Sequence, residues 1–277
     1  MKKFSFLALI LIALLCGCNN YNALLKSGNY SYKYEVAKQY YAEGHYNRAS
    51  MMLSDVVTSL KGTEKGEESL YLLGMSSYKA RDYDAATTYF KKYYQSYPRG
   101  LYSEEARYMT GIALYESTPE PRLDQSGTYE AVSELQGFLD TYPESRFRKT
   151  AQEHIFELQD KLVEKEYLSA KLYYDLGAYI GNGSNGNYQA CIVTAENALR
   201  DYPYMSRRED FSFLILKAKF DYAKNSVASR QEERYNNAID EYYGFQSEFP
   251  ESKYSKEAES LFRHIPQKFR RSTSTAK

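Results

Sequence analysis

Residues 70–98 carry a spacing pattern that strongly limits how the chain can fold. Two small residues, Gly74 and Ala86, are each followed four positions later by an aromatic residue, Tyr78 and Phe90. Pro98 comes twelve positions after Ala86. The small residues allow two helix backbones to approach closely, the rings fill the space around them, and the proline ends the second helix. The pattern therefore predicts a helix hairpin.

The same pattern recurs five times along the chain. The small position of the second helix is occupied by Ala49, Ala86, Ala131, Cys191 and Ala238. A tyrosine lies four residues after the small position of each first helix, at Tyr41, Tyr78, Tyr115, Tyr174 and Tyr222. These offsets resemble those of the tetratricopeptide repeat (TPR), a 34-residue helix–turn–helix unit. We therefore expect an all-α protein, a TPR solenoid of five helix hairpins with a C-terminal capping helix. An ordinary helical bundle with tyrosine-rich faces is the alternative.

Three turns are longer than the repeat requires. They lie at residues 116–128, 180–187 and 224–234, and the first two are rich in Pro or in Gly and Asn. Because loop-closure entropy grows slowly with length, such insertions cost little stability. They are either contact loops or tolerated surface variation, and the sequence leaves both interpretations open.

Residues 145–176 contain neither Pro nor Gly, and apolar residues recur there at helical spacing. This stretch predicts one helix of about thirty residues that joins two and a half repeats on each side. The predicted domains are a signal peptide at 1–17, a tether at 18–29, an N-terminal half at 30–144, a C-terminal half at 145–267 and a disordered tail at 268–277.

The N-terminus indicates export and lipidation. Lys2 and Lys3 precede an apolar run that is too short to cross a membrane but typical of a signal peptide. Residues 15–18 (Leu-Cys-Gly-Cys) resemble the bacterial lipobox, which implies that Cys18 is acylated and begins the mature protein; an ordinary secretory signal is the alternative. Asn19 in place of Asp, and the lack of a following acidic run, favour the periplasmic face of the outer membrane.

The composition argues against an enzyme or a nucleic-acid binder. Lys plus Arg and Asp plus Glu both total 36, so no net field attracts a polyanion. The three histidines lie far apart, and no phosphate-binding or nucleophile motif is present. We expect no catalytic residue, no metal site and no cofactor. Cys191, the one cysteine besides Cys16 and Cys18, is expected in the core.

Tyrosine dominates the aromatic residues, with 31 Tyr and no Trp. The fifth positions of the first four first helices are Tyr34, Tyr71, Tyr108 and Tyr167. These rings are the candidate lining of a peptide-binding groove, because phenol rings combine apolar area with a hydrogen-bonding tip. The alternative is that they pack one hairpin against the next.

The lipobox, the five repeats and the repeat ends Tyr-Pro-Arg-Gly (97–100), Tyr-Pro-Glu-Ser (142–145) and Phe-Pro-Glu-Ser (249–252) resemble the BamD family of outer membrane β-barrel assembly lipoproteins. The resemblance covers nearly the whole mature chain. It implies that the C-terminal repeats bind the periplasmic domains of BamA, with other BAM lipoproteins as partners. It also implies that the N-terminal repeats bind unfolded outer membrane protein precursors.

A different class of protein is the alternative: a periplasmic TPR lipoprotein that captures glycan or coordinates envelope synthesis. The absence of Trp disfavours the glycan-binding version, because sugars stack on Trp platforms.

Overall fold

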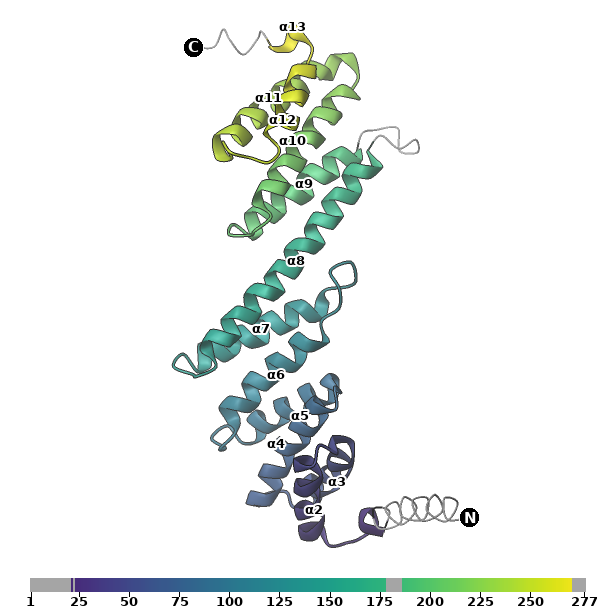
Figure 1. Ribbon diagram of the computed structural model, residues 1–277, viewed down its shortest axis with the longest axis vertical. Helices are drawn as coiled ribbons and strands as arrows, with labels where there is room; N and C mark the ends of the chain where they lie inside the picture. Colours follow the sequence, from purple (N-terminus) through teal and green to yellow (C-terminus); the bar gives the residue numbers. More distant parts are fainter. Residues whose placement is uncertain (1–20, 22, 178–185, 271–277) are drawn as a thin grey trace, which may run out of the picture. The chain divides into compact units, whose positions relative to one another are not determined.

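The computed structural model describes residues 21, 23–177 and 186–270, and all regular secondary structure in this part of the chain is helical (Figure 1). The chain divides into two compact units. Of the described residues, unit 1 comprises 21, 23–119 and 126–155, and unit 2 comprises 120–125, 156–177 and 186–270.

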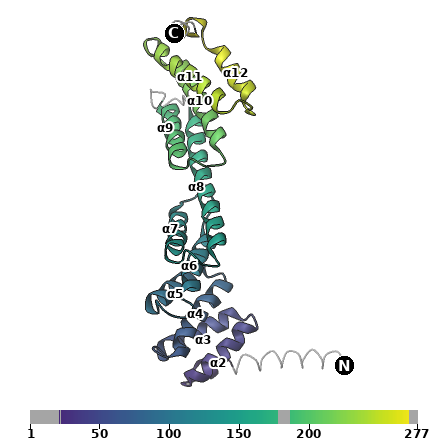
Figure 2. The ribbon, with the colours of Figure 1, turned by 90° about the vertical axis from the view of Figure 1, so that its left-hand side faces the viewer.

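Unit 1 is a series of helix hairpins. Its helices are α2 (Tyr30–Ala42), α3 (Tyr46–Ser59), α4 (Glu64–Lys79), α5 (Tyr83–Ser96), α6 (Ser103–Ser117) and α7 (Ser126–Thr141). Each packs against the next along the chain, as Figures 1 and 2 show. The three predicted N-terminal hairpins are therefore present.

The predicted long helix is also present, as α8 (Arg148–Leu176, 29 residues). It begins after Ser145, because residues 145–147 form a turn in which the Ser145 hydroxyl accepts a hydrogen bond from the Phe147 amide at 3.0 Å. The first part of α8 belongs to unit 1, and from Phe156 onward the helix belongs to unit 2. The division between units thus falls within α8, not at residue 144 as expected, because the two ends of one helix pack in different cores.

Unit 2 continues with α9 (Gly186–Asp201), α10 (Arg208–Lys224), α11 (Ala228–Glu248), α12 (Ser255–His264) and α13 (Gln267–Arg270). Helix α12 packs on α10 and α11 as the predicted cap. The expectation of a disordered tail at 268–277 is wrong for residues 268–270, which belong to helix α13. Phe269 is buried with its ring 5.1 Å from that of Tyr235, so ordered structure reaches at least Arg270.

The small positions of the repeat lie where helices meet. Ala37, Ala49, Ala86, Ala131, Ala170, Cys191 and Ala218 are completely buried. A Cβ atom added to Gly74 would lie 2.7 Å from the Phe90 ring, and one added to Gly111 would lie 2.4 Å from Leu135. Such distances leave no room for a side chain, so the register assigned from the sequence is confirmed.

The expected tether at 18–29 is shorter in the structure. Residues 21 and 23–25 are helical, and Tyr21, Leu24 and Leu25 pack against the core of the first hairpin. Asn29 caps α2, since its side chain accepts a hydrogen bond from the Tyr32 amide at 3.0 Å. Apolar residues within the polar-looking stretch explain the difference.

Several expectations concern residues outside the described ranges: the signal peptide at 1–17, the acylation of Cys18 and most of the inserted turn at 180–187. Within the described ranges, no helix combines the length and the apolar character that a membrane span requires.

The helix contacts predict how the small positions respond to substitution. Ala86→Leu or Ala131→Leu should overpack unit 1 and destabilise it by about 1–3 kcal/mol. Lys92→Leu, an exposed position on α5, is the control and should be near neutral. Thermal unfolding followed by circular dichroism measures both effects; equal melting temperatures for the three variants would contradict the assigned packing.

Candidate protein-binding surfaces

The four candidate groove tyrosines lie on α2, α4, α6 and α8. Tyr34, Tyr71 and Tyr108 are buried, with 3%, 8% and 8% of their surface exposed, and Tyr167 is half-buried. Burial of this extent means that the ring faces contact the protein itself.

A second ring covers each buried ring in the middle of the series. Tyr102 stacks on Tyr71 with centroids 4.2 Å apart, and Phe147 stacks on Tyr108 at 4.3 Å. In unit 2 Tyr254 covers Phe213 in the same way at 4.2 Å. The covering residue always lies immediately before the next first helix, so each stack joins consecutive hairpins.

Cations take the place of the covering ring in the other two hairpins. The Lys65 ammonium lies 5.0 Å from the Tyr34 centroid, and the Arg207 guanidinium lies 4.6 Å from that of Tyr167. These are cation–π contacts. The structure therefore favours the packing interpretation of the four tyrosines over the open groove that was the other expectation.

Sequence reasoning missed these covering residues, although a signal for four of them exists. Tyr102, Phe147, Arg207 and Tyr254 each lie four positions after the proline that ends the preceding repeat. A large ring or a guanidinium at this offset is the detectable signature of the stack. Phe213 was also missed, because it precedes the expected fifth position on its helix.

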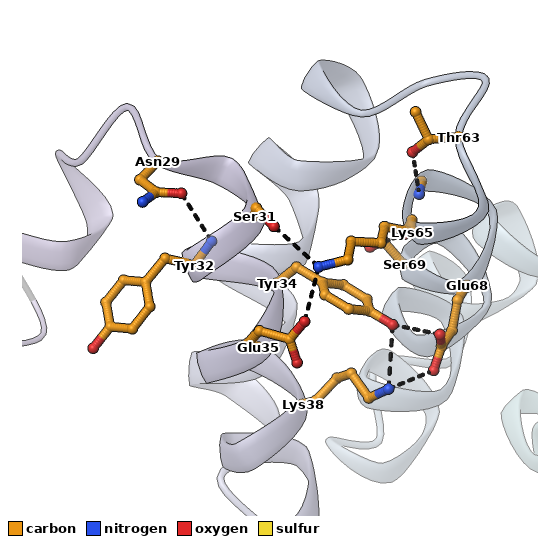
Figure 3. A network of polar contacts seen from close by, with 11 residues as sticks. Asn29, Ser31, Tyr32, Tyr34, Glu35, Lys38, Thr63, Lys65, Glu68 and Ser69 are labelled. Atoms are coloured by element: carbon orange, nitrogen blue, oxygen red, sulfur yellow. Dashed lines mark hydrogen bonds and ion pairs between the residues drawn. The ribbon is translucent and has the colours of Figure 1, made fainter.

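The polar tip of Tyr34 belongs to a charged network between α2 and α4 (Figure 3). Tyr34 donates a hydrogen bond to Glu68, and the Lys38 ammonium lies 2.9 Å from the other Glu68 oxygen. Beside them, Lys65 pairs with Glu35 at 2.9 Å. The phenol is thus already bonded within the protein, and the rim of this hairpin presents paired charges.

The pKa shifts in this network have opposing causes. Burial is the main cause that raises the pKa of Tyr34, and the Glu68 carboxylate adds to it. Burial would also raise the pKa of Glu68, but the hydrogen bonds from Tyr34 and Lys38 outweigh it and leave this pKa below its usual value. Glu68 is therefore held as a carboxylate at neutral pH.

Unit 2 contains a cavity of about 470 Å³ that is lined by residues of α9, α10 and α11. The Arg234 guanidinium lies over the Tyr222 ring at 3.8 Å from its centroid. Lys219 bridges Glu241 at 2.7 Å and Glu196 at 3.4 Å. An arginine in contact with a tyrosine ring in the lining of a cavity has the composition of an interface anchor.

A second hollow of unit 2, about 370 Å³, carries exposed aromatic rings. Phe156 and Tyr204 line it and have 67% and 99% of their surface exposed. These rings, unlike the four predicted tyrosines, are accessible to a partner.

The described residues contain no group of three or more His, Cys, Asp or Glu that could hold a metal ion. Cys191 is completely buried in the core of unit 2. Burial raises the pKa of its thiol to about 12, so the thiolate is strongly disfavoured at neutral pH. Its expected role in core packing is confirmed.

Comparison with known proteins assigns this helical-repeat protein to a family. Residues 27–184, more than half of the chain, match the family described as outer membrane lipoprotein, YfiO. The chain belongs to this family.

Curated relatives include a putative outer membrane protein assembly factor BamD of Aquifex aeolicus (strain VF5). It is 27% identical over 180 residues, which cover 64% of this chain and 59% of the relative. The outer membrane protein assembly factor BamD of Caulobacter vibrioides is 21% identical, with 68% and 58% covered, and that of Pasteurella multocida is 23% identical, with 65% and 72% covered. The chain thus spans about three fifths of the length of the first two relatives.

Among solved structures, the nearly identical TPR-like repeats of a protein titled putative kinesin light chain from Podosopora anserina are 13% identical. The match covers 80% of this chain and 96% of that one, with a TM-score of 0.32. At so low a TM-score the likeness supports no conclusion about this chain.

The network of Figure 3 predicts a selective effect of removing one hydroxyl. Tyr34→Phe should destabilise unit 1 by about 0.5–1.5 kcal/mol, because it deletes the hydrogen bonds to Glu68 and Lys38. Tyr32→Phe is the matched control on the same helix, since Tyr32 is exposed and its hydroxyl makes no hydrogen bond among the described residues.

The effect should depend on pH with a definite sign. Because the folded pKa of Glu68 is lowered, its contribution to stability is present above the usual Glu pKa and is lost as the pH falls through the folded value. The difference in melting temperature between Tyr34→Phe and the unaltered protein should therefore shrink in acid. A difference that stays constant from pH 7 to pH 3 would contradict this assignment.

Proposed function

We propose that the chain is a non-catalytic, lipid-anchored scaffold of the outer membrane β-barrel assembly (BAM) complex. The observation that carries the proposal is the family match over residues 27–184, together with curated relatives named outer membrane protein assembly factor BamD. Stacked helix hairpins support it, because repeat proteins of this kind bind other proteins over extended surfaces.

The anchor of this scaffold is Cys18, acylated after cleavage of residues 1–17. The protein then lies at the periplasmic face of the outer membrane. Several acyl chains on one residue bind a bilayer stably where one chain binds it only reversibly.

BamA docks through its periplasmic domains on unit 2. The cavity of unit 2 supports this assignment, since Arg234 on Tyr222 offers a cationic anchor in a lining that also includes Ile192 and Phe245. Arginine and tyrosine are the residues most enriched at binding hot spots. Neighbouring carboxylates of the cavity, Asp240 and Glu241, add polar partners.

Unfolded precursors of outer membrane proteins bind to unit 1. A hollow of about 370 Å³ beside the Tyr71–Tyr102 stack supports this part of the proposal. Leu101, with 83% of its surface exposed, supplies apolar contact there, while Glu67 and Glu68 line the same hollow. In unit 1 the rings of Tyr34, Tyr71 and Tyr108 are buried, so they support the hairpins and do not contact the peptide with their ring faces. Tyr167 lies in unit 2 and takes no part in this surface.

The anchor is tested by labelling with a fatty-acid analogue in the native host. Cys18→Ala should abolish the label and leave an uncleaved or unanchored protein, because the acylated sulfur is gone. Cys16→Ala, two residues away, is the control and should stay labelled. Label retained on Cys18→Ala would exclude this residue as the anchor.

The function is tested by depletion and by affinity capture. Depletion should lower the amount of folded β-barrels in the outer membrane and leave soluble periplasmic proteins unchanged. Capture from detergent-solubilised outer membrane should recover a barrel protein with repeated periplasmic domains. Capture of glycan-uptake components alone, with barrel assembly intact after depletion, would replace the proposal with the glycan-binding alternative.

The docking surface is tested in the same capture by charge reversal. Arg234→Glu should reduce recovery of the barrel protein at least tenfold, because it removes the anchor and introduces repulsion beside Glu241. Arg230→Glu, an exposed position on the same helix, is the matched control and should leave recovery within about twofold.

A further inference from the structure

We infer that the α2/α3 hairpin lies directly against the phospholipid headgroups, held there by a tether of only three residues. The inference rests on the proposed acylation of Cys18. It concerns which surface of unit 1 faces the membrane and how closely.

The chain is already packed at Tyr21. The Tyr21 ring meets the Tyr40 ring edge-on, with centroids 5.8 Å apart. Leu24 and Leu25 pack against the core that includes Ala37 and Met52. Tyr21, Leu24 and Leu25 are therefore part of the first hairpin, although the composition around them is that of a linker.

A buried lysine fixes this segment in place. Lys33 of α2 is only 2% exposed. Its ammonium donates to the Leu25 carbonyl at 2.6 Å and pairs with Asp55 of α3 at 3.0 Å. A buried charge needs such partners, so releasing the segment would leave the ammonium with one of them missing. Lys33 thus ties the N-terminal segment to both helices of the hairpin.

The length of the chain between Cys18 and Tyr21 limits how far apart these two residues can lie. Three peptide units separate Cys18 from Tyr21, and a fully extended chain spans at most about 3.6 Å per residue, so the two Cα atoms lie within about 11 Å. Had all of residues 18–29 been free, the same limit would be roughly 40 Å. Because the acyl chains place Cys18 at the headgroups, Tyr21 and the side chains around it must lie there too.

The surface that the tether brings to the membrane carries aromatic rings, a cation and an exposed methionine. We call Tyr21, Tyr40, Arg48 and Met51 the anchor face. The Arg48 guanidinium lies over the rings of Tyr21 and Tyr40, at 5.4 and 5.7 Å from their centroids. Met51 is 56% exposed, with its sulfur 3.5 Å from the Tyr21 hydroxyl.

These residues suit a headgroup layer. Arg48 makes no ion pair with a carboxylate among the described residues, so its charge is available to a lipid phosphate. Tyrosine rings with a polar tip are typical of the membrane–water interface, and an exposed methionine adds apolar area. Tether length and surface chemistry therefore indicate the same occupant, a phospholipid surface.

The test uses the lipidated full chain in phospholipid vesicles that contain a headgroup quencher. An environment-sensitive fluorophore is attached at Met51→Cys, with Lys92→Cys on α5 as the matched control. Cys191→Ala removes the remaining thiol. Quenching at position 51 should exceed that at position 92 at least threefold. Equal quenching at the two positions in acylated protein would overturn the inference.

Two further variants test the tether as the cause. Ten Gly/Ser residues inserted between Asn20 and Tyr21, or Lys33→Met to free the segment, should lower quenching at position 51 toward that at position 92. The insertion leaves every described contact intact, so it decides the question if Lys33→Met does not fold. Quenching that survives the insertion would overturn the tether as the cause.

Mass spectrometry of the same samples separates this inference from the proposed function. Absence of acyl groups on Cys18 would count against the proposed anchor. Acylated protein with no preferential quenching at position 51 would count against the membrane contact alone.

Discussion

The close approach of helix backbones at alanine and glycine is the constraint on which the rest of the structure depends. At Gly111 the space that a Cβ atom would need is already filled by Leu135, and Ala86 and Ala131 are completely buried. This proximity lets the two helices of a hairpin pack together while the hairpin also contacts the next hairpin along the chain. The packing of small against large residues in the core then sets the distance between neighbouring helices.

A second interaction also links the hairpins. An aromatic ring or a cation packs on the fifth-position ring in the first helix of the preceding hairpin. Tyr102 on Tyr71 and Phe147 on Tyr108 use parallel rings, whereas Lys65 and Arg207 use their charge. Rings that are committed to these stacks are unavailable to a partner. The surfaces that remain accessible include the cavity beside Arg234 and Tyr222 and the exposed rings of unit 2.

Much of the fold could be predicted from local patterns, and the candidate site could not. The long helix was predictable because no Pro or Gly interrupts residues 145–176, and the hairpins because small residues recur at fixed offsets. Tyr34 and Tyr71 were placed correctly on their helices, but periodicity does not say whether a ring on the inner side of a helix is covered. The covering residues lie about thirty to forty positions later in the chain, Tyr102 and Phe147 between helices and Lys65 at the start of α4, and only packing brings them there.

By itself the sequence determined the helical class, the hairpin register and the core position of Cys191, because each depends on residue type at short spacing. The lipobox around Cys18 stays a prediction. Tertiary structure alone decided that the four tyrosines are packed, that Lys33 binds the Leu25 carbonyl on the first hairpin, and that the division between the two units falls within α8. These are outcomes of contacts between distant segments. Such contacts depend on which surfaces meet once the helices have formed, and no local pattern contains that information.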